Sequence, residues 1–138
     1  MPTILVVDDH EEIREALTEI LEEEGHEVLQ DVDGLDALEV IASSRPDVVL
    51  LDIAMPGMDG LETLRRLKDQ PEFSTLPVIM VTAQGDRQNM VTAVQLGVRD
   101  YVTKPWEPGE VEMCVNWALK AANVNSGQQD PPLLAQSA

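Results

Sequence analysis

Acidic, hydroxyl and basic side chains follow several short apolar runs of this sequence. Asp8 and Asp9 follow the first run, Asp52 follows a run in the middle of the chain, and Thr82 and Lys104 follow two later runs. Clustered carboxylates repel one another, and a divalent cation with a preference for oxygen ligands, such as Mg²⁺, relieves that repulsion. A metal ion, a lysine and a hydroxyl group around a carboxylate can stabilise a phosphoryl group in transfer. Asp52 is therefore predicted to be a nucleophile that accepts a phosphoryl group.

The elements that must position these residues alternate between strands and helices. Short apolar runs predict strands at residues 3–7, 27–31, 47–51, 77–81 and 98–102. Apolar residues at helical spacing predict helices at residues 10–24, 34–42, 59–69, 86–96 and 108–122. In the second helix, Leu35, Leu38 and Ile41 are expected to face inward. Pro108 is expected in the first turn of the last helix, where proline is favoured.

Alternating strands and helices with short connections predict a single α/β domain, a doubly wound (βα)5 sandwich around a five-stranded parallel sheet. The runs at residues 47–51 and 77–81 are apolar without alternation, which favours central strands covered on both faces. The carboxyl ends of parallel strands lie along one edge of a sheet, so the polar residues that follow them should converge on one pocket. The domain is expected to span residues 1–122, with residues 123–138 as a flexible tail or linker.

The composition argues against several classes of function. The 138 residues carry a formal net charge of −17, from 26 acidic and 9 basic residues, which argues against nucleic acid and anionic membranes as direct partners. No signal peptide is evident, and no apolar run approaches the roughly 18–20 residues of a membrane span. The single cysteine, Cys114, excludes an internal disulfide. A cytoplasmic location is therefore expected.

Four segments at the ends of predicted strands form a combined motif: ILVVDD at residues 4–9, DVVLLDIAMPGMDG at 47–60, PVIMVTA at 77–83 and GVRDYVTKPW at 97–106. Together they resemble the response-regulator receiver family (CheY-like) of two-component signalling. In this combination they are specific to that family, and the resemblance covers nearly all of residues 3–122. It implies a flavodoxin-like sheet with strand order 2-1-3-4-5.

The resemblance also implies the chemistry of the site. Asp52 would accept a phosphoryl group from the phosphohistidine of a histidine kinase or from a phosphotransfer protein. The reaction would depend on Mg²⁺, or on Mn²⁺ in its place, bound by Asp8, Asp9, Asp52 and the backbone carbonyl of Ala54. The protein would then be a phosphoacceptor that assists its own phosphorylation and dephosphorylation, rather than an enzyme.

A second group of roles concerns the response to phosphorylation. Thr82 would rotate inward to hydrogen-bond the phosphoryl group, and Lys104 would form an ion pair with it. Tyr101 matches an aromatic switch residue that turns inward when Thr82 moves. The peptide bond between Lys104 and Pro105 is expected to be cis.

Two departures from the family concern the lifetime of the phosphorylated form. Ala54 lies two residues after Asp52, and Gln84 lies two residues after Thr82, at positions that flank the path of the hydrolytic water. Neither side chain is acidic, so neither can act as a general base. An acyl phosphate that is not unusually short-lived is therefore expected. Trp106 stands where the family more often has phenylalanine.

The face formed by the fourth helix, the fifth strand and the fifth helix is the usual output surface of the family, for a downstream protein or a second copy. Met113 and Trp117 are four residues apart on the fifth helix, and they either pack at the edge of the core or form an apolar contact patch on this surface. Cys114 is expected in the core, and it occupies about the place of an arginine in dimer-forming winged-helix members of the family. That replacement argues against their salt-bridged dimer.

Two other classes of function are weighed against a receiver. A phosphohydrolase of the haloacid dehalogenase type would need a second acid two residues after its nucleophile, where this chain has Ala54. A constitutive interaction module with an inactive site would have lost an aspartate or the lysine, and none is missing. Whether the chain stands alone or is the receiver part of a larger regulator or kinase stays open at this point.

Overall fold

The computed structural model of the chain describes residues 1–83 and 86–124. Most of the expected tail, from residue 125 on, lies outside this range. The elements are β1 (Thr3–Val7), α1 (Glu11–Glu23), β2 (Glu27–Asp31), α2 (Gly34–Ser44), β3 (Val48–Asp52), α3 (Gly60–Lys68), a short 3₁₀ helix (Pro71–Phe73), β4 (Val78–Ala83), α4 (Arg87–Gln95), β5 (Asp100–Lys104) and α5 (Glu110–Val124).

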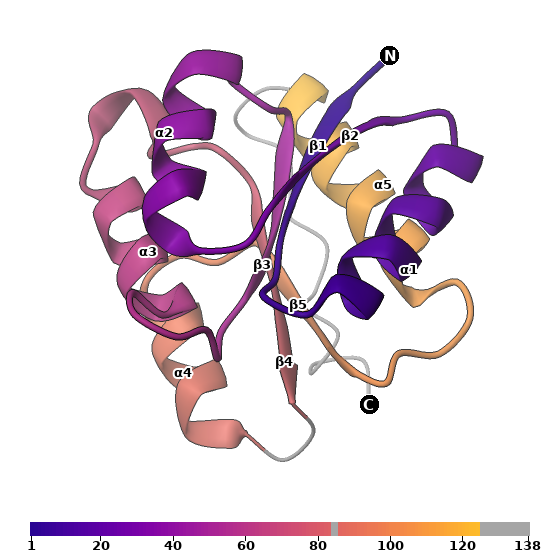
Figure 1. The fold of residues 1–138 in the computed structure, drawn as a ribbon. Helices are drawn as coiled ribbons and strands as arrows, with labels where there is room; N and C mark the ends of the chain where they lie inside the picture. The colour runs from indigo at the N-terminus through magenta and orange to yellow at the C-terminus, as the bar shows by residue number, and fades with distance from the viewer. Residues whose placement is uncertain (84–85, 125–138) are drawn as a thin grey trace.

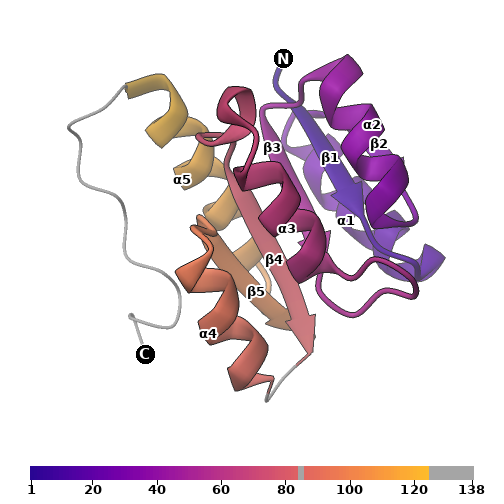
Figure 2. The same ribbon diagram turned by 90° about the vertical axis from the view of Figure 1, so that its left-hand side faces the viewer.

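The five strands form one parallel sheet in the order β2-β1-β3-β4-β5, which confirms the predicted topology. Helices α1 and α5 cover one face of the sheet, and α2, α3 and α4 cover the other (Figures 1 and 2). All five residues of β3 are buried, because this strand lies in the centre of the sheet with helices on both sides.

The core has two parts, one on each face of the sheet. Successive residues of β1 contribute to opposite parts, as the two-residue period of a strand requires: Leu5 and Val7 pack on the side of α2 and α3, and Ile4 and Val6 pack on the side of α1 and α5. Cys114 of α5 is buried in the second part, and this burial raises the pKa of its thiol. Cys114 is therefore packed in the core, as expected, and a thiol with a raised pKa forms less of the reactive thiolate.

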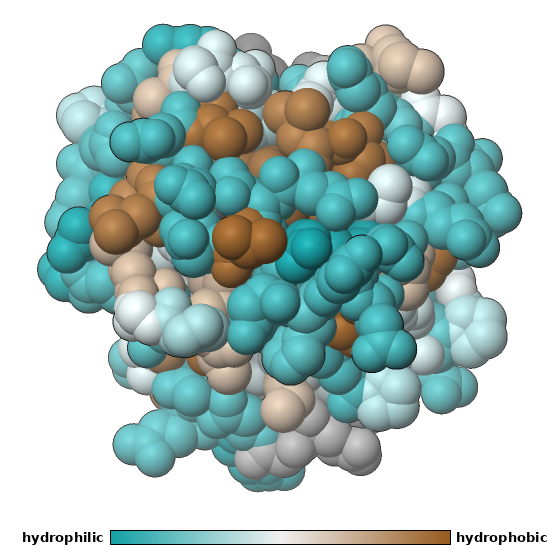
Figure 3. Space-filling view, in the orientation of Figure 1, coloured by the Kyte–Doolittle hydropathy of each residue, from teal (hydrophilic) through white to brown (hydrophobic). Residues whose placement is uncertain are grey.

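The exterior agrees with the acidic composition. On the face shown in Figure 3, hydrophilic side chains cover most of the surface, and hydrophobic side chains gather in separate patches. In the described part of the chain, no helix combines the length and the apolar character needed to cross a membrane.

Two expectations are wrong, one about the buried face of a helix and one about where a helix begins. The side chain of Leu35 does not face inward, since Leu35 is 59% exposed. Its neighbour Gly34 is buried against α3, where a Cβ atom would lie 2.0 Å from Oγ1 of Thr63, so the buried stripe of α2 runs through Gly34, Ala37 and Ile41 instead. Pro108 is not in the first turn of α5, which begins at Glu110.

Candidate functional site

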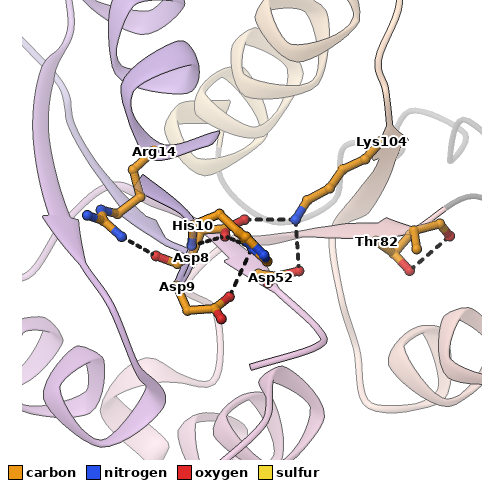
Figure 4. Close-up of polar contacts among 8 residues, drawn as sticks. Asp8, Asp9, His10, Arg14, Asp52, Thr82 and Lys104 are labelled. Atoms are coloured by element: carbon orange, nitrogen blue, oxygen red, sulfur yellow. Dashed lines mark hydrogen bonds and ion pairs between the residues drawn. The ribbon is translucent and has the colours of Figure 1, made fainter. Parts of the chain in front are cut away.

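The carboxyl ends of four neighbouring strands bring the predicted polar residues to one edge of the sheet (Figure 4). Asp52 is the last residue of the central strand β3, and Asp8 directly follows β1. Thr82 lies in β4 and Lys104 is the last residue of β5, so both strands end two residues later than predicted. Pairing of β4 with β5 continues to Ala83 and Lys104, which extends the sheet to the site itself.

The carboxylates at this edge are buried close together. Asp8 is 1% exposed and Asp52 is 3% exposed. Asp8, Asp9, His10 and Asp52 each offer a ligand atom, and these atoms lie within 4.8 Å of one another. Oδ2 of Asp52 is buried without a hydrogen-bond partner among the described residues. Burial, and then the charge of Asp8, raise the pKa of Asp52 to about 6, and Lys104 opposes this shift.

Lys104 supplies a cation to this cluster. Its Nζ donates to Oδ2 of Asp8 at 2.9 Å and to Oδ1 of Asp52 at 3.3 Å (Figure 4). Burial lowers the pKa of Lys104, but the hydrogen bond to Asp8 and the charge of Asp52 outweigh that effect, and the net shift is upward. The ammonium therefore stays charged beside two buried carboxylates, one of which keeps an unpartnered oxygen.

His10 is a member of the cluster that the sequence reasoning did not include. Its Nδ1 lies 3.2 Å from Oδ1 of Asp8 and 3.2 Å from Oδ1 of Asp9, and its backbone N–H donates to Oδ1 of Asp8 at 2.8 Å. The predicted metal site had oxygen ligands only, and a lone histidine does not form a zinc site, so His10 was left out. Its position next to the predicted acidic pair was the signal that could have identified it.

Two further residues fix the backbone of the site. Arg14, in α1, donates from Nη1 to the carbonyl oxygen of Asp8 at 2.8 Å and so ties the first helix to the end of β1. Gly60, at the start of α3, packs so closely that a Cβ atom would lie 2.1 Å from the carbonyl oxygen of Asp52. Its N–H donates to the carbonyl oxygen of Ile53 at 2.8 Å, which holds the loop after β3 against the strand end.

Thr82 is not in contact with the carboxylate cluster in this structure. Its hydroxyl is buried and donates to the carbonyl oxygen of Ala83 at 3.5 Å, away from Asp52 (Figure 4). Tyr101 is buried in the core part that includes α3 and α4, with its ring turned inward. Burial, followed by the charge of Asp100, raises the pKa of Tyr101.

Three further sequence predictions have different outcomes. Ala54 is exposed two residues beyond β3, and its role as a metal ligand stays a prediction. The peptide bond between Lys104 and Pro105 is cis. Gln84 lies outside the described residues.

Met113 and Trp117 lie on the outer side of α5. They are 43% and 47% exposed, which argues against the alternative that they belong to the core. With Asn116 and Lys120 they line a shallow depression, and Nζ of Lys120 lies 5.7 Å from the centre of the Trp117 ring. This group of four residues is called the α5 patch below.

The donor set suits a hard divalent cation. Three carboxylates converge, one carboxylate oxygen is buried without a partner, and the pKa of Asp52 is raised by burial and by a neighbouring negative charge. A divalent ion with oxygen ligands would give the buried oxygen a partner and offset the negative charge around Asp52. Lys104 carries one positive charge, whereas the buried carboxylates of Asp8 and Asp52 carry two negative charges when both are ionised. The edge of the sheet can therefore hold a metal ion and concentrate positive charge around the buried carboxylate of Asp52.

Comparisons with known proteins agree with this geometry. Residues 4–116 match the family model for the response regulator receiver domain. The chain is 41% identical over 131 residues to the phosphate regulon transcriptional regulatory protein PhoB of Pseudomonas aeruginosa, covering 95% of this chain and 56% of PhoB. It is 39% identical over 119 residues to the protein PilH of the same organism, covering 86% of this chain and 98% of PilH. The chain thus spans about half the length of several regulators that it matches, and nearly all of PilH.

Solved structures give the same result. The response regulator receiver domain protein of Clostridium thermocellum superimposes with a TM-score of 0.84 at 28% identity, over 90% of this chain and 98% of that one. The signal receiver domain of a signal transduction histidine kinase from Syntrophus aciditrophicus gives a TM-score of 0.82 at 32% identity, over 96% of this chain and 98% of that one. Similar domains thus occur both in regulators and within a kinase.

Proposed function

Because the chain belongs to the response-regulator receiver family, we propose that Asp52 is its phosphoacceptor and that phosphorylation switches a protein-binding surface. Receiver domains are phosphoacceptors rather than enzymes that act on a separate substrate. The observation that carries the assignment to Asp52 is its buried carboxylate at the end of the central strand, with an unpartnered Oδ2 beside a charged lysine.

In this proposal the domain binds one divalent ion, Mg²⁺ or Mn²⁺, through Asp8, Asp9, Asp52 and the backbone carbonyl of Ala54. When bound, the ion neutralises charge on the carboxylates and on the phosphoryl group in transfer. The converging carboxylates and the raised pKa of Asp52 support this assignment. A cation offsets the repulsion between the carboxylates and favours the ionised form of Asp52.

The chain's own residues perform the transfer. A carboxylate oxygen of Asp52 attacks phosphorus while the bond from phosphorus to the donor's imidazole nitrogen breaks, which leaves an acyl phosphate and a neutral imidazole after it takes up a proton. Lys104 already lies 3.3 Å from Asp52 and compensates the added negative charge. The Thr82 hydroxyl, which now faces Ala83, rotates to donate to the phosphoryl group, and Tyr101, which is already buried before that rotation, keeps its inward position.

The acyl phosphate is proposed not to be unusually short-lived. Ala54 is exposed and carries no acid that could activate water. Gln84, at the second position that flanks the water path, has no carboxylate either.

The partners follow from the same scheme. A histidine kinase or a phosphotransfer protein donates the phosphoryl group. The output surface is formed by α4, β5 and α5, and the α5 patch provides its apolar contact for a downstream protein or a second copy of the chain. The domain is proposed to end near residue 122, followed by a tail or by a linker to further domains.

Phosphorylation by a small-molecule donor tests the central claim. Metal-free protein is mixed with acetyl phosphate, with and without Mg²⁺, and intact mass is measured for the wild type, Asp52→Asn and the exposed control Asp36→Asn. The wild type and Asp36→Asn should gain one phosphoryl group only with Mg²⁺, and Asp52→Asn should gain none. Equal modification of Asp52→Asn, or none of the wild type, would reject the assignment.

A further inference from the structure

We infer that His10 is a nitrogen ligand of the divalent metal site, and that it shifts the preference of the site from Mg²⁺ toward transition metals such as Mn²⁺ and Co²⁺. The inference rests on the metal site proposed above and goes beyond its oxygen ligands. It comes from the position of one imidazole in the structure: His10 directly follows the acidic pair, and its Nδ1 is among the ligand atoms that lie within 4.8 Å of one another.

The distances suit shared coordination. Nδ1 of His10 lies 3.2 Å from a carboxylate oxygen of Asp8 and 3.2 Å from a carboxylate oxygen of Asp9 (Figure 4). Neighbouring ligands of one ion, at the usual metal–ligand distances, lie about 3.0–3.4 Å apart. The nitrogen and the two oxygens are therefore already spaced as ligands of the same ion.

A second and independent observation indicates that a cation belongs here. Asp52 is 3% exposed, and its Oδ2 has no hydrogen-bond partner among the residues that the structure describes. Lys104 contacts the other oxygen of Asp52 and one oxygen of Asp8, so this ammonium does not satisfy Oδ2. A buried carboxylate oxygen without a partner is costly, and coordination to a metal ion removes that cost.

Apart from the contacts of Nδ1 with Asp8 and Asp9, the described contacts give the imidazole no structural task. His10 is the N-cap residue of α1, but its side chain makes no capping hydrogen bond, and its backbone N–H donates to Asp8 independently of the ring. The side chain is 64% exposed, so the ring can exchange its hydrogen bonds for a metal bond without disturbing the core.

The nature of the ligand determines the expected selectivity. Mg²⁺ prefers oxygen ligands, whereas an imidazole nitrogen suits first-row transition metals. Oxygen sites also bind Co²⁺ more tightly than Mn²⁺, so a raw preference for Co²⁺ says little about His10. The informative quantity is the change in each affinity when the imidazole is removed.

Calorimetric titration of the metal-free full chain tests the inference. MgCl₂, MnCl₂ and CoCl₂ are titrated separately at pH 8, to limit competition from protons, into the wild type, His10→Ala and Asp9→Asn. His10→Ala should weaken Co²⁺ binding about tenfold or more, and Mn²⁺ binding by a smaller factor, while Mg²⁺ affinity changes less than about threefold. Asp9→Asn should weaken binding of all three ions, because it removes an oxygen ligand.

The outcomes separate this inference from the proposed function. If His10→Ala alters the three affinities equally, or alters none, the imidazole is only a hydrogen-bond donor and the inference fails while the metal site stands. If the wild type binds none of the ions, both fail. Electron spin-echo measurements on Mn²⁺-loaded protein give a second readout: modulation from an imidazole nitrogen is expected in the wild type and should vanish in His10→Ala. Its presence in both proteins would also overturn the inference.

Discussion

At the carboxyl edge of the sheet charged side chains are buried, whereas on α5 large apolar side chains are exposed. Asp8 and Asp52 lie almost entirely out of solvent, while nearly half of the Trp117 surface is accessible. Each arrangement reverses the usual distribution of polar and apolar groups, and each has a cost that folding alone does not explain. In our proposal a divalent cation and a phosphoryl group complete the first region, and a partner surface covers the second. The two regions thus differ in the kind of ligand that each is proposed to bind.

The strongest way to break the first region is to remove its cation. Lys104→Met should lower the free energy of unfolding by about 2–4 kcal/mol at pH 7 without divalent ions, because Asp8 and Asp52 lose their charged partner. Urea unfolding measures this difference. The control Lys120→Met removes an exposed lysine of the α5 patch and should cost less than about 1 kcal/mol. Equal effects of the two substitutions would contradict the contrast between the regions.

Removing the negative charge of Asp52 should instead raise the free energy of unfolding. The pKa of Asp52 is raised from 3.8 to about 6 in the folded protein, so between these pH values the folded state binds more protons than the unfolded state. Stability from this group is complete below about pH 4 and is lost as the pH rises through 6. Asp52→Asn should therefore be more stable than the wild type by about 2–3 kcal/mol at pH 7, without metal.

The measurement for Asp52→Asn is the stability difference from the wild type between pH 4 and pH 8. The difference should be near zero at pH 4 and reach its full size above pH 6. A difference that is constant across this range would show that packing of the amide, rather than the charge of Asp52, determines stability.

Added Mg²⁺ should reduce the stability difference between Asp52→Asn and the wild type. A ligand present at about ten times its Kd stabilises the folded state by about 1.4 kcal/mol. The melting temperature of the wild type should therefore rise with MgCl₂, and that of Asp52→Asn should rise much less. NaCl at the same ionic strength is the control, and an equal rise of both proteins in MgCl₂ would argue against a site that includes Asp52.

The smallest effect on stability is expected in the second region. Trp117→Ala should change the free energy of unfolding by less than about 1 kcal/mol, because the indole is half exposed, and should weaken association of the phosphorylated form with its partner. The matched control on the same helix is the buried Val115→Ala, which should cost about 1–3 kcal/mol. Chemical denaturation and pull-down with beryllofluoride-treated protein measure the two effects. Unfolding of Trp117→Ala would instead assign the indole to the core.

How much the sequence could predict differs between the same two regions. The positions of Asp8 and Asp52 follow from strand order, because a parallel sheet brings strand ends together whatever the side chains do. The direction of the Thr82 hydroxyl does not follow, since rotation about one bond turns it toward Ala83 or toward Asp52. The predicted site did not include His10, because no motif in the sequence required a histidine there.

On the helices, the prediction placed Cys114 of α5 correctly in the core but misplaced Leu35 in α2. Leu35 was predicted to face inward because leucine is hydrophobic. The close approach of α2 to α3 at Gly34, a tertiary contact, turned the helix so that the smaller residue is buried. Such contacts between helices have no local signal, whereas the alternation of strands and helices is repeated along the whole chain.

The ion pair between Lys104 and Asp8 joins residues that are 96 positions apart in the sequence. During synthesis the acidic residues emerge first, and their cation follows only when β5 has been made and has paired with β4. A nascent or truncated chain without β5 therefore carries the acidic cluster but lacks the lysine that compensates its charge. The electrostatic balance at this edge of the sheet is in this way coupled to the addition of the last strand in the chain.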